Sequence, residues 1–280
     1  MLALVTRRGR LVAAAVYVSI NLIAIQLTIA LGPHVDDWQL FTSLATRLEE
    51  GDLYRTSPAF VWSPVAAWIL AAVTAIGYWP WVVLHFLSLI LVRPPWLAVL
   101  TLSSWAFWWD TASAHTMTFV FVCGLLAIRG NRGGSLAYLA LTILMPRPIQ
   151  FPLALWILWK MPGTRMPFAG LALGHAVLVI LIGLHWEWIQ AMATFGGASS
   201  GIGPARYLGI AWLAIGIPLG LWLASVGKLG WAGVAISPHH LPQYLLMPLL
   251  DLGRRNADSP TTDDHGDKNA LQSAPPRRPR

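Results

Sequence analysis

The sequence predicts an all-α, polytopic integral membrane protein of about nine to eleven membrane helices, and three observations predict this class. The 280 residues are 56% hydrophobic, only 11% are charged, and the mean hydropathy is +0.59. Between Asp52 and Asp251 the only carboxylates are Asp110 and Glu187. Basic residues stand singly or at the ends of apolar segments, as membrane topology requires.

The apolar segments follow one another along the chain. A basic N-terminus precedes the first, 11–32, which we interpret as an uncleaved first span because no small-residue cleavage site follows it. The others are 59–77, 80–92, 95–109, 115–128, 135–146, 149–160, 168–185, 207–226 and 229–250. One of the four between 59 and 128 is expected to be re-entrant or interfacial, since the loop of Arg129 and Arg132 should lie in the cytoplasm. The last is expected to break at 237–240.

Two domains follow from this pattern. A membrane-embedded domain covers 1–253, and the polar, Pro-rich tail 254–280 is expected to be disordered in the cytoplasm. Within the first domain, 34–57 is an extracytoplasmic loop that is expected to hold an interfacial amphipathic helix. Its apolar residues recur at roughly helical spacing and Gly51 ends the run: Trp38, Leu40, Phe41, Leu44 and Leu48.

Several functional classes are disfavoured. The single cysteine, Cys123, allows no internal disulfide. The scattered basic residues do not form a nucleic-acid surface. A metal site is unlikely because the adjacent His239 and His240 diverge on a helix and no further ligand has suitable spacing. We therefore expect neither metal nor cofactor.

Three polar groups fall on the extracytoplasmic side of this topology: Asp36 with Asp37, Arg147 in a Pro-Arg-Pro turn, and His239 with His240. A carboxylate can take the proton of an attacking hydroxyl. Arg can bind a phosphate through two parallel hydrogen bonds, and histidine can share that phosphate. Each signal alone has a structural alternative, namely a solvated loop, a snorkelling side chain or an interfacial histidine pair.

The residues also resemble a family. His34-Val-Asp-Asp-Trp-Gln-Leu-Phe41, then Gly51 and Leu53-Tyr54, is similar to the first outer loop of polyprenol-phosphate-mannose-dependent α-1,2-mannosyltransferases, the actinobacterial type of the glycosyltransferase C superfamily. Three later strings also look like family motifs, in the family's order: Phe60-Val-Trp62-Ser-Pro64, Met145-Pro-Arg147-Pro148 and Ile236-Ser-Pro-His239-His240.

The resemblance implies a site. The family's catalytic Asp falls on Asp37, four residues before Phe41, with Asp36 as a supporting charge. Arg147, in place of the family's Lys, and His239 or His240 would bind the donor phosphate. Tyr54, Trp62 and His115 would have lesser parts in substrate binding. The chain departs from the family at Ser113-Ala-His115-Thr, where a Gly-Gln is usual, and its outer loop 186–206 is compact.

The expected function is transfer of a sugar, mannose by resemblance, from a polyprenyl-phosphate donor to a glycolipid or glycan acceptor at the outer face of the cell membrane. Two alternatives stay open. A lipid or solute transporter or flippase would need ionisable residues within its spans, where His85 and His175 are the best candidates. A non-catalytic assembly subunit, or a degenerate member of the family, would not depend on Asp37.

Overall fold

The computed structural model describes residues 19, 21–22, 36–56, 62–197, 205–238 and 241–257. Every element in these ranges is helical, so the predicted all-α class is confirmed for the described part of the chain. The helices of the first half are α2 (Asp36–Glu49), α3 (Leu53–Thr56), α4 (Pro64–Thr74), α5 (Tyr78–Ser88), η1 (Leu89–Leu91), α6 (Pro95–Leu102), α7 (Trp105–Ala112), α8 (Met117–Ile128) and α9 (Arg132–Leu144). Those of the second half are η2 (Pro148–Gln150), α10 (Phe151–Lys160), η3 (Pro162–Thr164), α11 (Arg165–Ile182), α12 (His185–Gly197), α13 (Ala205–Leu208), η4 (Gly209–Ala211), α14 (Trp212–Ser225), α15 (Leu229–Ile236), η5 (Pro242–Leu246) and α16 (Leu249–Ala257).

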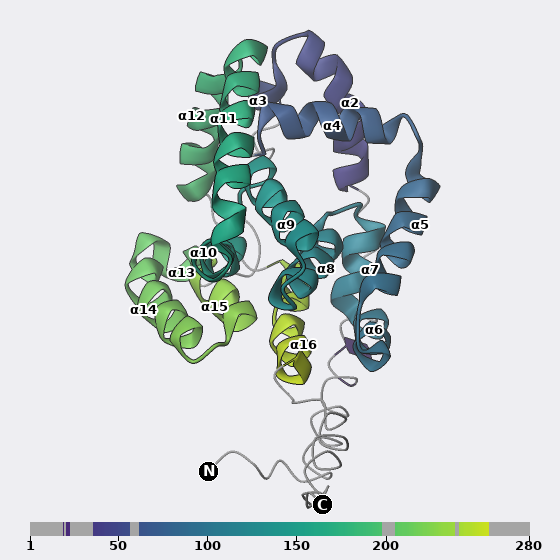
Figure 1. Ribbon diagram of the computed structural model, residues 1–280. Helices are drawn as coiled ribbons and strands as arrows, with labels where there is room; N and C mark the ends of the chain where they lie inside the picture. Colours follow the sequence, from purple (N-terminus) through teal and green to yellow (C-terminus); the bar gives the residue numbers. More distant parts are fainter. Residues whose placement is uncertain are drawn as a thin grey trace, which may run out of the picture.

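The predicted amphipathic helix is present as α2. Its apolar face is buried at Phe41, Leu44 and Leu48, where it packs on α4. Gly51 then adopts a positive φ of 69°, which favours glycine and ends the run. In Figure 1, α2, α3 and α4 lie at one end of the molecule, above the upright helices α8 and α9, while α16 lies at the other end.

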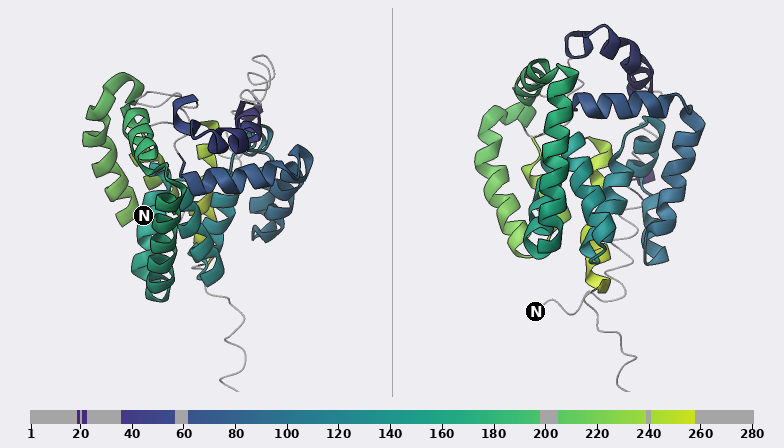
Figure 2. Two further views of the ribbon diagram at one scale, coloured as in Figure 1. Left: turned by 90° about the horizontal axis from the view of Figure 1, so that it is seen from above. Right: turned by 45° about the horizontal axis from the view of Figure 1, so that its top comes forward.

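The apolar segments between 59 and 128 form shorter helices than a simple series of spans. The chain bends by 106° between α4 and the segment of α5 and η1, Tyr78–Leu91. Figure 2 shows α4 lying across the upper ends of the upright helices. The single segment expected at 95–109 is two helices instead. It breaks because the hydroxyl of Ser104 accepts a hydrogen bond from the N–H of Phe107 and starts α7.

Helix α8 lies in the centre of the larger hydrophobic cluster. Its side chains are buried on nearly every side, among them Phe121 and Leu125, and they pack with Tyr138 of α9 and Leu153 of α10. The Tyr138 hydroxyl donates to the backbone oxygen of Gln150 at 3.1 Å and so fixes η2 beside α9. This contact places the turn that carries Arg147.

Small residues let the C-terminal helices approach closely. Gly216 and Gly220, spaced four apart on α14, face α15, and a Cβ on Gly216 would lie 2.6 Å from the Ala235 oxygen. Such spacing is typical of helix pairs in membranes. The expected break of 229–250 is confirmed, since α15 ends at Ile236 and η5 begins at Pro242. Helix α16 continues to Ala257, four residues past the expected domain boundary.

One described helix is long and apolar enough to cross a membrane, Pro162–Ile182, and the bent pair α4 and α5 passes the same test if taken as one span. Val179 is the only buried residue of α11. Large apolar side chains are exposed over much of the described surface, including Trp79, Trp159 and Leu181.

Candidate functional site

Arg147 is a buried cation, only 7% exposed, between α9 and η2. Its Nη1 donates to the Thr116 hydroxyl and to the Met117 sulfur, each at 3.1 Å. The hydrogen bonds that Arg147 makes to described residues all use Nη1. The Nε and Nη2 edge, which is the edge that binds carboxylate or phosphate side-on, is therefore left for another partner.

Trp62 lies under the Arg147 guanidinium, 4.8 Å from its carbon to the ring centroid. The Tyr54 hydroxyl donates to the Trp62 backbone oxygen at 2.8 Å. Burial raises the pKa of the Tyr54 phenol well above its usual value, so the hydroxyl keeps its proton and remains a donor. The structure thus brings together three residues that the sequence singled out: Tyr54, Trp62 and Arg147.

Helix α2 joins this group through Phe41, whose ring lies 5.6 Å from that of Trp62. Asp37 precedes Phe41 by four residues on the same helix, so its backbone lies about one helical turn, roughly 6 Å, along the axis from Phe41. The side chains of Asp36 and Asp37 lie outside the part of the chain that the structure describes. The structure describes only the backbone of these two residues, at the start of α2.

His239 and His240 also lie outside the described residues. The chain on their C-terminal side packs close to the site, because η5 contacts α8, whose first residue, Met117, accepts from Arg147. Ser237, on their N-terminal side, is buried at the end of α15.

His115 contributes its backbone to the site. Its carbonyl oxygen accepts from Nε2 of His85 at 3.0 Å, and it directly precedes Thr116, the partner of Arg147. Its side chain is half-buried. A role in substrate binding remains a prediction.

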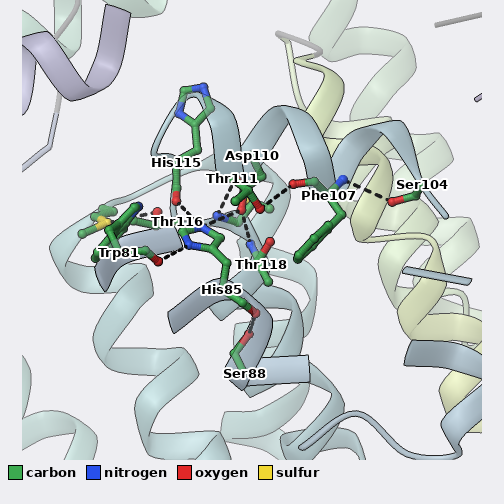
Figure 3. A network of polar contacts seen from close by, with 12 residues as sticks. Trp81, His85, Ser88, Ser104, Phe107, Asp110, Thr111, His115, Thr116 and Thr118 are labelled. Carbon is green, nitrogen blue, oxygen red and sulfur yellow. Dashed lines mark hydrogen bonds and ion pairs between the residues drawn. The ribbon is translucent and has the colours of Figure 1, made fainter. Parts of the chain in front are cut away.

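His85 and Asp110 form a buried pair that the sequence did not single out as a site, and Figure 3 shows it beside the 115–118 turn. Their side chains are fully buried, with Nε2 and Oδ2 3.6 Å apart. The two residues are 25 positions apart on different helices, and no spacing pattern links them. The Asp110 oxygens also bind the N-terminus of α8, where they accept from the N–H groups of Met117 and Thr118 at 3.0 and 2.6 Å.

The electrostatics of Arg147 are unusual. Apart from Asp36 and Asp37, whose side chains are not described, no Asp or Glu in the described ranges lies in ion-pair range of it. A guanidinium is always charged, and a buried charge is costly unless it is paired. The stacking on Trp62 offsets only part of that cost. The arrangement therefore favours an anion at the free guanidinium edge.

Among the described residues, no group of three or more His, Cys, Asp or Glu side chains could hold a metal ion. The groups that come together here are a cation, hydroxyls and aromatic rings. These groups suit an anionic organic ligand.

Comparison with known proteins gives no relative: no family model matches the chain, and neither a curated protein nor a solved structure does.

Proposed function

We propose that the protein is a membrane glycosyltransferase that moves a sugar from a polyprenyl-phosphate donor to an acceptor hydroxyl on the extracytoplasmic face of the cell membrane. The observation that carries this proposal is the buried Arg147, stacked on Trp62 with its Nε and Nη2 edge unused by the described residues. A phosphate monoester or diester has the charge and geometry for that edge.

The reaction follows from this arrangement. The oxygen of the acceptor hydroxyl attacks the anomeric carbon of the sugar, and the carboxylate of Asp37 takes the hydroxyl proton. The bond from the anomeric carbon to the phosphate oxygen breaks, and the polyprenyl phosphate leaves with the electron pair. Arg147 stabilises the charge that grows on this phosphate in the transition state. The family resemblance suggests mannose as the sugar and inversion at the anomeric carbon.

A bilayer location is supported by the surface of the molecule. Helix α11 and the preceding η3 together span 21 residues, or roughly 31 Å, and face outward almost throughout. Exposed apolar surface of this kind marks a contact with lipid or with another protein. We propose that α2 lies at the outer membrane interface, where a lipid-bound donor can reach Arg147.

The test is transfer of labelled mannose from polyprenyl-phosphate-mannose by membranes that contain the full chain. Asp37→Asn is expected to lower the rate about a hundred-fold or more, because the proton acceptor is lost. Glu49→Gln, at the exposed far end of the same helix, is the matched control and should keep the rate. Equal rates for Asp37→Asn and the wild type would remove Asp37 from the mechanism, and an inactive wild type would contradict the proposed function.

A further inference from the structure

The His85 side chain has acceptors on both sides. Its Nδ1 lies 2.9 Å from the Trp81 backbone oxygen and its Nε2 lies 3.0 Å from the His115 backbone oxygen. Carbonyl oxygens only accept hydrogen bonds, so both ring nitrogens must carry a proton to satisfy the two contacts. The ring is then an imidazolium, and Asp110, 3.6 Å from Nε2, is its counter-charge.

Asp110, on α7, also binds the free N–H groups at the N-terminus of α8. Its two carboxylate oxygens accept from Met117 and Thr118, and its backbone oxygen accepts from the N–H of His115 at 2.8 Å. In the 115–118 turn, His115, Met117 and Thr118 are each hydrogen-bonded to Asp110 (Figure 3). The carbonyl oxygen of His115 also accepts from His85. This set of bonds fixes the turn on one side.

Arg147 is bonded to the other side of this turn. Nη1 uses the Thr116 hydroxyl and the Met117 sulfur as its acceptors. The Thr116 hydroxyl in turn donates to the Met145 sulfur at 3.4 Å, so its lone pairs point toward Arg147. The direction of the free guanidinium edge depends on where the 115–118 turn is held.

We propose that His85 and Asp110 are positioning residues for the donor phosphate: the buried pair holds the 115–118 turn, and the turn aims the Nε and Nη2 edge of Arg147. This inference rests on the proposed function, because it takes the anion at Arg147 to be the phosphate of a lipid carrier. Neither His85 nor Asp110 touches that phosphate.

The experiment uses the full chain in detergent and two probes, farnesyl phosphate and the uncharged farnesol. The ratio of their affinities reports the phosphate contact alone. Asp110→Asn replaces one acceptor oxygen by an NH₂ group that faces a backbone N–H, and it leaves His85 without its counter-charge. We expect the preference for farnesyl phosphate to fall on the order of ten-fold to a hundred-fold, as for a displaced binding group.

Asp251→Asn is the matched control. The Asp251 carboxylate is also buried and also accepts two backbone N–H groups, those of Gly230 and Trp231 at 3.1 Å, at the start of α15. Both substitutions lower Tm by breaking a similar cap. Only Asp110→Asn should change the affinity ratio.

A second variant covers the case in which Asp110→Asn does not fold. His85→Gln removes the positive charge and leaves the Asp110 cap in place, and it should also lower the ratio. An unchanged ratio in this variant, or in a folded Asp110→Asn, overturns the inference. Arg147→Met separates the two proposals. Suppose that it abolishes the preference for farnesyl phosphate, while Asp110→Asn leaves the affinity ratio unchanged, as Asp251→Asn does. The positioning role then fails, and the proposed function stands. A wild type without preference for farnesyl phosphate would contradict the proposed function itself.

Discussion

At the scale of single residues, some buried polar groups of the described core have hydrogen-bond partners and others have none. The side chains of Asp110 and His85 form an ion pair with each other, and both also form hydrogen bonds with nearby backbone atoms. Gln150, three residues after Arg147, is fully buried, yet neither its amide oxygen nor its amide nitrogen has a hydrogen-bond partner among the described residues. A buried amide without a partner costs about 1–3 kcal/mol. Gln150 is therefore a weak point in the fold that a polar ligand could relieve.

Replacing Gln150 by Leu should stabilise the free protein, by about 1 kcal/mol or more, because an apolar side chain carries no desolvation cost there. The midpoint of thermal unfolding in detergent measures the effect. Gln39→Leu on the exposed side of α2 is the control and should change the midpoint little, since water solvates that amide. A lower midpoint for Gln150→Leu would show that the amide is paired in the folded state.

At the scale of elements, close backbone contact holds the C-terminal helices together. Gly230 is the second residue of α15, and a Cβ at this position would overlap the backbone oxygen of Met247. Its N–H also donates to Asp251, and Arg254 of α16 donates to the Gly227 oxygen at 3.1 Å. Helix α16 is therefore bonded to the turn between α14 and α15. Backbone atoms cannot move aside as the end of a flexible side chain can.

Gly230→Ala should consequently destabilise the protein by about 1–3 kcal/mol, the usual cost of overpacking. Gly170→Ala is the control, because Gly170 lies in the middle of α11 with no atom within 4 Å of its Cβ position. That change should be neutral or stabilise by up to about 1 kcal/mol through helix propensity. Denaturant unfolding followed by tryptophan fluorescence measures both, and equal effects of the two substitutions would contradict this packing.

The sequence predicted elements better than contacts. Hydrophobic periodicity located α2, and the polar interruption at 237–240 located the break after α15. The sequence did not predict the break at Ser104. A single capping hydroxyl within an apolar segment hardly changes the mean hydropathy from which such segments are recognised. Through the family resemblance, the sequence assigned Tyr54, Trp62 and Arg147 to one site, and the structure brings them together. The sequence did not predict the His85–Asp110 pair, since pairing between helices depends on tertiary packing that no local pattern records.

At the scale of the whole molecule, the candidate site includes Tyr54 of α3 and Trp62, two residues before α4. The end that carries α2, α3 and α4 lies opposite α16 (Figures 1 and 2). The proposed topology puts the first end outside and α16 inside. Helix α11 runs between them: Gly163 lies two residues before its first residue, and α12 begins three residues after its last. The two ends of α11 should therefore face opposite sides of the membrane.

This orientation is testable by labelling of single cysteines in intact cells with a membrane-impermeant maleimide. In a Cys123→Ala background, Ala193→Cys on the exposed side of α12 should be labelled, because α12 is expected to lie outside. Gly163→Cys should react only after the cells are permeabilised, and its Cβ meets no atom within 4 Å, so the substitution itself is tolerated. Positive charges near Gly163, at Lys160 and Arg165, favour the cytoplasmic side for this end. Labelling of both cysteines in intact cells would mean that α11 does not cross, and the lipid-linked donor would then have to reach Arg147 by another route.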